Sequence, residues 1–270
     1  MKLHRRRRVM LVTGASGFLG RHLVRGPISE EWEMIAPTST SMDVTHRSGV
    51  LDTITSWKPD VVAHLAYRKD RRTIVDGSRH VAEACVAAGS RLVHLSTDVV
   101  FAGRPSPYTE RDVPDPILQY GIDKRDAELA VTSVAPDAAI IRTSLLYGSD
   151  TPSAFQHELA ASLRSGRPTA TFFTDEFRCP VHADDVARAV GVVAAQHGLG
   201  GVLHVAGPER MSRLDYALRL AAFAGFPHAD LASSTVAESG QVRSQDVALD
   251  SSLAATLDIH SRSLRDTLGT

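Results

Sequence analysis

Short apolar runs alternate with amphipathic stretches through the first half of the chain. Runs of apolar and β-branched residues predict strands at 9–12, 32–36, 61–65, 91–95 and 138–142. The stretches between them carry apolar residues at helical spacing and predict helices at 18–25, 49–57, 74–88 and 119–134. Regular alternation of this kind implies parallel strands joined by right-handed crossovers. The pattern therefore predicts an α/β fold built on a doubly wound parallel Rossmann sheet.

The regular alternation ends after residue 147. Helices are predicted at 154–163 and 184–196 and a strand at 202–205, with an irregular stretch up to residue 180. We therefore predict a Rossmann dinucleotide-binding region at 1–150, with a return segment over 182–206. The remaining segments, 151–181 and 207–270, are predicted to form a small C-terminal substrate-binding lobe.

Three glycines follow the first predicted strand and open the first predicted helix. Their spacing, G-x-x-G-x-x-G, allows a tight turn, close approach of a pyrophosphate and close packing of the helix on the sheet. The helix N-terminus also offers free N–H groups to an anion. The alternative is a tight strand-to-helix turn that binds no ligand. The residues expected to bind the dinucleotide here are Gly14, Ser16, Gly17, Phe18, Leu19, Gly20 and Arg21.

The end of the second predicted strand bears on the choice of nicotinamide cofactor. An acidic residue at this place would bind the ribose hydroxyls of NAD, but the strand leads into Thr38, Ser39 and Thr40. Small hydroxyl side chains leave room for a 2′-phosphate, and Arg21 is placed to pair with it. An ordinary exposed helix residue is the alternative for Arg21. The sequence thus favours NADP(H), with NAD(H) possible.

Tyr120 and Lys124 stand four residues apart at the start of the predicted helix 119–134, so both side chains lie on one helix face. An unperturbed tyrosine has a pKa of about 10, and a neighbouring ammonium group lowers this pKa toward the working pH. Such a phenol can donate a proton to a carbonyl oxygen while hydride arrives from the nicotinamide. Lys124 would also hold the nicotinamide ribose. A surface pair on a helix is the alternative.

A hydroxyl group is expected beside this pair, at the carboxyl end of a strand. The predicted strand 91–95 leads into Ser96 and Thr97, at the edge where doubly wound sheets bind their ligands. One of these hydroxyls can hydrogen-bond the alkoxide that develops on the substrate. The alternative is that Ser96 or Thr97 only caps a loop.

Charge and composition limit the classes of protein. The formal net charge of -1 argues against a nucleic-acid partner, because such proteins carry an excess of basic residues. The apolar run 9–12 is shorter than the roughly 7–15 residues of a signal peptide and the roughly 18 of a membrane span. We therefore expect no membrane partner and a cytoplasmic location, with Cys85 and Cys179 reduced. The twelve histidines show no metal-ligand spacing, so no metal is expected, and His64 and His94 are interpreted as core residues.

Several segments together resemble the extended short-chain dehydrogenase/reductase family, and within it the dTDP-4-dehydrorhamnose reductase branch. The resemblance spans nearly the whole chain, and the stretch from Ser96 to Gly103, Ser-Thr-Asp-x-Val-Phe-x-Gly, is fairly specific to this branch. The other segments that carry it are 13–20, 58–62, 120–124, 141–148, 185–189 and 243–253.

The resemblance implies an NAD(P)-dependent oxidoreductase that reduces a nucleotide-linked 4-keto-6-deoxysugar. It implies a catalytic set of Thr97, Tyr120 and Lys124. The family pattern places Asp43 and Val44 at the adenine and Leu65, Ala66 and Tyr67 beside the cofactor ribose. Substrate contacts are expected from Ser96, Phe101, Ser144, Arg178 and Arg243, the two arginines because guanidinium groups suit phosphate oxygens.

The chain also departs from the family pattern. Val99 stands where related dehydratases carry an acid, which disfavours dehydration, and Ile74 replaces the usual asparagine three residues before Gly77. The loop after Tyr67 is short and basic; it either grips a substrate diphosphate or is a solvated charged loop. Two alternatives stay open: a sugar epimerase or other ketone reductase, and a non-catalytic dinucleotide-binding regulatory subunit. The assembly considered is a homodimer.

Overall fold

The computed structural model describes residues 7–167 and 170–269. The chain divides into two compact units. The first unit comprises Met1–Ser96, Asp123–Ile141 and Ala187–Val202, and the second comprises Thr97–Ile122, Arg142–Val186 and Leu203–Thr270. This division differs from the sequence-based boundary at residue 150, because 97–122 and 142–150 group with the second unit. The sequence-based assignment of functional regions stays a prediction.

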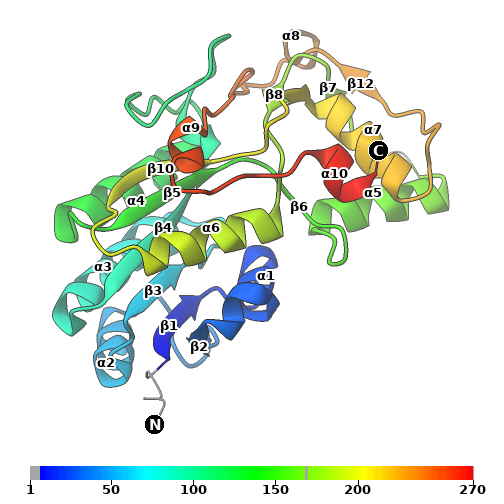
Figure 1. Ribbon diagram of the computed structural model, residues 1–270. Coiled ribbons are helices and arrows are strands. Elements are labelled where there is room, and N and C mark those ends of the chain that lie inside the picture. Colours follow the sequence, from blue (N-terminus) through cyan, green and yellow to red (C-terminus); the bar gives the residue numbers. More distant parts are fainter. Residues whose placement is uncertain (1–6, 168–169, 270) are drawn as a thin grey trace. The chain divides into compact units, whose positions relative to one another are not determined.

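A six-stranded sheet is the framework of the fold (Figure 1). Its strand order is β2-β1-β3-β4-β5-β10, and the pairs β1/β2, β1/β3 and β3/β4 are parallel. The chain moves from β1 to β2 on one side and then to β3 on the other, which creates a switch point beside the end of β1. The doubly wound α/β fold is thus confirmed. The strands are β1 (Arg8–Thr13), β2 (Trp32–Ile35), β3 (Val61–His64), β4 (Arg91–Thr97), β5 (Ala139–Thr143) and β10 (Gly201–Val205).

Helices cover the sheet because each presents an apolar stripe to it. The buried cluster that includes Val50, Val81 and Val131 joins three helices to the strand residues Leu11 and Leu92. This cluster places α2, α3 and α4 on one face, while α1 and α6 cover the other (Figure 1). The bounds are α1 (Phe18–Arg25), a 3-10 turn η1 (Pro27–Glu30), α2 (Arg47–Trp57), α3 (Gly77–Ala88), α4 (Gln119–Val134) and α6 (Ala183–Ala195).

The predicted helix 74–88 begins differently from a regular α-helix. Its first turn, η2 (Arg72–Asp76), is a π-turn that runs directly into α3. The Ser78 hydroxyl donates to the Ile74 carbonyl at 2.6 Å. This bond satisfies a backbone oxygen in the wide turn. Apolar periodicity identified the segment, but a single wide turn leaves that periodicity almost unchanged.

The second unit is built from short elements around its own core. It contains three pairs of two-residue strands: β6 with β9, β7 with β12, and β8 with β11. Tyr147, Phe172 and Tyr216 are among the buried side chains of this core. The bounds are η3 (Asp98–Val100), β6 (Leu146–Tyr147), α5 (Ala154–Ser165), β7 (Phe172–Phe173), β8 (Phe177–Arg178), β9 (Val181–His182), β11 (Met211–Ser212), α7 (Arg213–Phe223), β12 (Ser233–Ser234), α8 (Val236–Ser239), α9 (Ser252–Ala255) and α10 (Leu264–Leu268).

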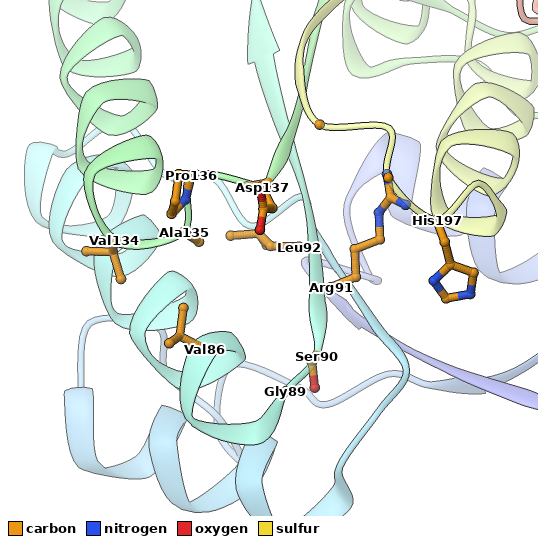
Figure 2. A pocket seen from close by; sticks show the side chains of 13 residues that line it. Val86, Gly89, Ser90, Arg91, Leu92, Val134, Ala135, Pro136, Asp137 and His197 are labelled. Atoms are coloured by element: carbon orange, nitrogen blue, oxygen red, sulfur yellow. The ribbon is translucent and has the colours of Figure 1, made fainter.

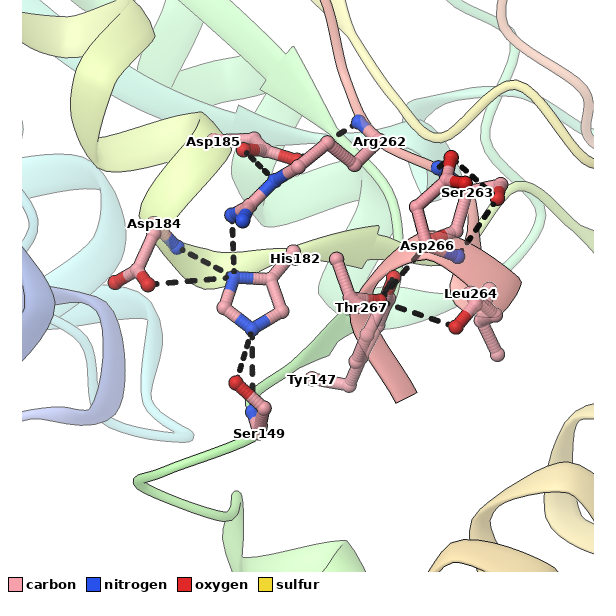
Figure 3. A network of polar contacts seen from close by, with 10 residues as sticks. All are labelled: Tyr147, Ser149, His182, Asp184, Asp185, Arg262, Ser263, Leu264, Asp266 and Thr267. Carbon is pink, nitrogen blue, oxygen red and sulfur yellow. Dashed lines mark hydrogen bonds and ion pairs between the residues drawn. The ribbon is translucent and has the colours of Figure 1, made fainter. Parts of the chain in front are cut away.

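A polar network attaches the C-terminal segment to the second unit (Figure 3). The Arg262 backbone N–H and Nε donate to the two carboxylate oxygens of Asp185, each at 2.9 Å. The Tyr147 hydroxyl lies 2.8 Å from the Thr267 hydroxyl. These contacts position α10 because they hold Arg262, two residues before the helix, and Thr267 within it.

Among the described residues, no helix combines the length and the apolar character needed to cross a membrane. Cys85 and Cys179 are both buried free thiols. Within the same residues, no group of three or more histidines, cysteines, aspartates or glutamates is arranged to hold a metal ion.

Candidate active site

The glycine turn after β1 is tightly packed. Gly14 adopts φ +70°, and a Cβ there would lie 2.7 Å from the Ala66 backbone nitrogen. A Cβ on Gly20 would lie 2.2 Å from the Gly14 carbonyl oxygen. The Gly17 N–H donates to that same carbonyl at 2.9 Å. Side chains are excluded at Gly14 and Gly20, so the turn fixes how the chain enters α1.

The N-terminus of α1 follows this turn without a capping side chain. Gly17 is the N-cap residue in an extended conformation, and it supplies no side-chain acceptor for the first helical N–H groups. A helix end of this kind offers N–H donors and a positive dipole end to an anion. The residues present therefore fit the pyrophosphate of a dinucleotide. Arg21 folds back on the turn, where its guanidinium donates to the Ser16 carbonyl at 2.8 Å.

Hydroxyl groups fill the turn after β2. The Thr38 and Thr40 hydroxyls lie 2.7 Å apart, and the Ser41 N–H donates to the Thr38 carbonyl at 3.1 Å. Asp43 follows this turn and accepts from both the N–H and the hydroxyl of Thr45, each at 2.9 Å. These bonds from Thr45 hold the pKa of Asp43 below its usual value.

A buried histidine links the glycine turn to the helix that follows β3. His64 Nδ1 lies 2.7 Å from the Thr13 hydroxyl, and His64 Nε2 lies 3.1 Å from the Ser78 hydroxyl. Because the Ser78 hydroxyl donates to the Ile74 carbonyl, it accepts from Nε2–H, and Nδ1 then accepts from Thr13. Thr13 also accepts from the N–H groups of residues 65 and 66 at 3.2 Å.

His94 lies beside His64, and their ring centroids are 5.4 Å apart. Both rings are buried, as expected from the sequence. Burial lowers the pKa of His64 to about 3 and the pKa of His94 well below its usual value, and the charge of Lys124 lowers both further. Both rings are therefore neutral. Unlike His64, His94 has no hydrogen-bond partner for either ring nitrogen.

Lys124 is buried at the carboxyl end of β4. Only 8% of its surface is exposed, and its Nζ donates to the Leu95 carbonyl at 2.5 Å. Burial lowers the pKa of Lys124 to about 8, while the negative charge of Glu128 opposes this effect. An ammonium group that loses its proton near neutral pH can adjust the acidity of a neighbouring phenol.

Tyr120 lies one turn before Lys124 on α4 and is 38% exposed. The next residue, Gly121, packs closely against the Val99 backbone, since a Cβ at Gly121 would lie 2.1 Å from the Val99 carbonyl oxygen. The first turn of α4 is therefore held against the segment that follows β4. In that segment the Thr97 hydroxyl accepts from the Val99 N–H at 3.4 Å and donates to Asp98 at 3.2 Å.

Three of the residues expected at the substrate are buried within the protein. The Ser96 hydroxyl donates to the carboxylate of Glu128, which is also buried. The Phe101 ring stacks on Tyr108 with centroids 4.0 Å apart, and the Ser144 hydroxyl donates to Asp98 at 2.6 Å. These side chains make internal contacts, and their role at the substrate stays a prediction.

The two arginines expected at a diphosphate share one acid. Arg243 Nε lies 2.8 Å from Glu176, and Arg178 NH2 lies 3.2 Å from the same carboxylate. Arg178 is buried and also lies 3.7 Å from Asp98, whereas Arg243 is partly exposed. The charge of Glu176 also acts on Arg213, which is partly buried. Sequence reasoning identified the arginines but not the carboxylate that positions them.

A separate cavity of about 890 Å³ lies at the amino ends of β4 and β5 (Figure 2). Its lining includes Arg91, Asp137 and His197, and no predicted site residue. The Arg91 guanidinium donates to the carbonyls of Gln196 and Leu199. These bonds give Arg91 a structural role at the end of α6, so the cavity does not extend the candidate active site.

The sheet, the glycine turn after its first strand and the tyrosine–lysine pair on α4 define a protein of the extended short-chain dehydrogenase/reductase class. Residues 7–270 match the family model described as RmlD substrate binding domain, and the chain belongs to this family. Among its relatives is dTDP-4-dehydrorhamnose reductase of Mycobacterium tuberculosis, which is 32% identical over 228 residues, 77% of this chain and 73% of the relative.

A second relative has a different name. Methionine adenosyltransferase 2 subunit beta of Danio rerio is 28% identical over 270 residues, 91% of this chain and 83% of the relative. Among solved structures, a hypothetical dTDP-4-dehydrorhamnose reductase from Sulfolobus tokodaii is similar with a TM-score of 0.80 and 29% identity, over 95% of this chain and 98% of that one. The reductase of Bacillus anthracis in complex with NADP shares the fold with a TM-score of 0.87 at 24% identity, over 98% and 97% of the two chains.

Proposed function

We propose that this protein is an NADP(H)-preferring reductase of a nucleotide-linked keto-sugar, similar to dTDP-4-dehydrorhamnose reductase. The observation that carries the proposal is the burial of Lys124, whose pKa is lowered to about 8, one helical turn after Tyr120. A charged lysine is costly to bury, and such a group near neutral pH is typical of acid–base chemistry. The 32% identity to the Mycobacterium tuberculosis reductase supports the substrate class.

In this proposal each residue has a separate task. A bound nicotinamide supplies hydride to the carbonyl carbon of the sugar. Tyr120 transfers its phenolic proton to the carbonyl oxygen, so the C=O bond becomes C–OH and the tyrosine becomes a phenolate. The ammonium group of Lys124 stabilises that phenolate, and the Thr97 hydroxyl hydrogen-bonds the oxygen. The glycine turn and the N–H groups of α1 bind the pyrophosphate.

The arginine group around Glu176 is proposed as the diphosphate site. Arg178, Arg213 and Arg243 all interact with the charge of Glu176, and Arg178 also lies near Asp98, so the positive charges in this group outnumber the negative ones and favour an anion. Arg243 is the partly exposed member and is proposed to contact the phosphate oxygens directly. Arg178 is buried, and we propose that it holds Glu176 and Asp98 in place.

A substrate screen tests the proposed function. Purified protein would be mixed with NADPH or NADH and a panel of nucleotide-linked keto-sugars, and the loss of nicotinamide absorbance would be followed. Reduction of a dTDP-linked 4-keto-6-deoxysugar, faster with NADPH, is expected. Cofactor binding without oxidation by any compound of the panel would overturn the proposal.

Two rivals have specific support. The 28% identity to methionine adenosyltransferase 2 subunit beta and the isoleucine at position 74 favour a dinucleotide-binding subunit without turnover. Tyr120 and Lys124 favour an enzyme over such a subunit. An epimerase would use the same fold, and product analysis in the same screen separates it from a reductase, because epimerisation leaves no net oxidation of the cofactor.

Three further properties complete the proposal. The Thr38–Ser41 hydroxyl turn and Arg21 support the preference for NADP(H). The free thiols of Cys85 and Cys179 support a cytoplasmic location. The proposed assembly is a homodimer. Light scattering coupled to size exclusion would measure the assembly.

A further inference from the structure

Glu128 is a buried acid that the proposed reaction does not use. It lies on α4 one turn after Lys124 and is only 5% exposed. The Ser96 hydroxyl, on β4, donates to the Glu128 carboxylate. The residue before it, Leu95, accepts from the Lys124 ammonium through its carbonyl. Two adjacent residues of β4 thus contact the lysine and the glutamate of the same helix face.

Burial of a carboxylate is costly unless a hydrogen bond and an opposite charge compensate for it. Ser96 supplies the hydrogen bond, and the ammonium of Lys124 is the opposite charge. The charge of Lys124 also acts on two titratable side chains of the sheet, His64 on β3 and His94 on β4, and Tyr120 precedes the lysine by one turn on α4. Burial lowers the pKa of both histidines, so neither ring places a positive charge beside the lysine.

We infer that Glu128, oriented by Ser96, is a positioning residue that keeps the Lys124 ammonium charged and directed toward the end of β4. The inference rests on the proposed function in one respect, namely that the Lys124 ammonium stabilises the Tyr120 phenolate. Without the carboxylate, burial would act on Lys124 unopposed. The lysine would then lose its proton at a lower pH and give less support to a tyrosinate.

The lysine content of the chain allows a direct test. The sequence contains only four lysines, Lys2, Lys58, Lys69 and Lys124. In protein labelled with 13C-lysine, the four side-chain Cε–Hε signals can be followed by NMR as the pH rises, and the Lys124 signal is identified by its loss in Lys124→Arg. The wild-type Lys124 signal is expected to titrate at about 8.

Glu128→Gln keeps the shape of the side chain and removes its charge. The Lys124 midpoint is expected to fall by about one pH unit or more in this variant, since an opposite charge at close range shifts a pKa by that amount. Leu129→Gln, at the exposed neighbour on α4, is the control and should leave the midpoint unchanged. An unchanged Lys124 midpoint in folded Glu128→Gln would overturn the inference.

Glu128→Asp decides the question if the glutamine variant does not fold. It keeps the charge but withdraws it by one methylene, so the Lys124 midpoint should fall below that of the wild type. A midpoint equal to that of the wild type in Glu128→Asp, with no folded glutamine variant, would also contradict the inference.

The pH profile of turnover gives a second readout. With Glu128→Gln, the alkaline limb of kcat should move to lower pH with the Lys124 midpoint, while the affinity for NADPH stays unchanged. The two failures remain distinguishable. A wild-type protein without turnover contradicts the proposed function, whereas the NMR midpoint of Lys124 tests the role of Glu128 without any substrate.

Discussion

Lys124 Nζ donates to the Leu95 carbonyl at 2.5 Å, which anchors the ammonium at the carboxyl end of β4. The neighbouring strands β1 and β3 end at the same edge of the sheet, because all three run parallel. The lysine and the glycine turn that follows β1 are therefore fixed to one edge of the first unit. This edge is where an open α/β sheet binds its ligands.

Tyr120→Phe removes the phenol that is proposed to supply the proton. Turnover should fall by about a thousandfold or more, because general acid catalysis contributes about 10²–10⁴ and the lost group has no replacement. The affinity for NADPH, measured by fluorescence titration, should stay the same. Tyr147→Phe is the matched control. It removes the hydrogen bond to Thr267, should lower the free energy of unfolding by about 1 kcal/mol, and should retain turnover. Equal turnover by Tyr120→Phe and wild type would contradict the assignment.

Gly20→Ala tests the glycine turn. The new Cβ would lie 2.2 Å from the Gly14 carbonyl oxygen, so the turn must move, and the Kd for NADPH should rise at least about tenfold. Gly49→Ala in α2 is the control, since nothing lies within 4 Å of its Cβ position. It should stabilise the protein by about 0.5–1 kcal/mol and leave cofactor affinity unchanged. Equal affinities in the two variants would argue against a cofactor at this turn.

Arg243→Gln tests the diphosphate site. The KM for the nucleotide-sugar should rise about tenfold or more with little change in kcat, because a charge-assisted hydrogen bond contributes about 1.5–3 kcal/mol. Arg219→Gln makes the same substitution on α7, where the arginine pairs with Glu209, and should leave KM unchanged. A fall in kcat at constant KM would instead place Arg243 in the chemical step.

The buried His64 predicts acid sensitivity of the fold. An unfolded histidine gains a proton as the pH falls through about 6.5, whereas folded His64 stays neutral down to about 3. The unfolded state therefore binds more protons in this window, and the free energy of unfolding falls by about 1.4 kcal/mol per pH unit for this group. Its contribution is fully present above pH 6.5.

Urea unfolding at several pH values between 4 and 7 would measure this dependence. In His64→Gln the slope of the unfolding free energy against pH should be smaller than in wild type by about 1.4 kcal/mol per pH unit, the contribution of one proton. Val62→Ala truncates a buried neighbour on β3, so it should lower stability but keep the wild-type slope. The same slope in His64→Gln and wild type would show that the ring is charged in the folded state.

The fold was predictable where the pattern is long and regular. The bounds of α1 and α4 agree with the predicted ranges 18–25 and 119–134, since several turns of apolar spacing define each helix. The strands β7 and β8 were not predicted, because two residues are too few for alternation to appear. The π-turn η2 before α3 was not predicted for a similar reason, since a single wide turn has no apolar pattern of its own.

The candidate site was predictable in its residues more than in its contacts. A motif gives the position of Ser96 but not the direction of its hydroxyl, which donates to a residue 32 positions later. The pairing of Arg243 with Glu176 joins residues 67 apart, and local spacing contains no information about it. Glu128 did have a signal in the sequence, since an acid four residues after a lysine lies on the same helix face and within reach of its charge.

The bonds from His64 to Thr13 and Ser78 fix the direction of every proton in that chain. The imidazole is therefore held in a single tautomer and is not available for acid–base chemistry, although the charge of Lys124 acts on it. Its role is structural, because it links the carboxyl end of the first strand to the segment that follows the wide turn η2. A replacement with only one polar atom would leave those two backbone segments free to shift independently.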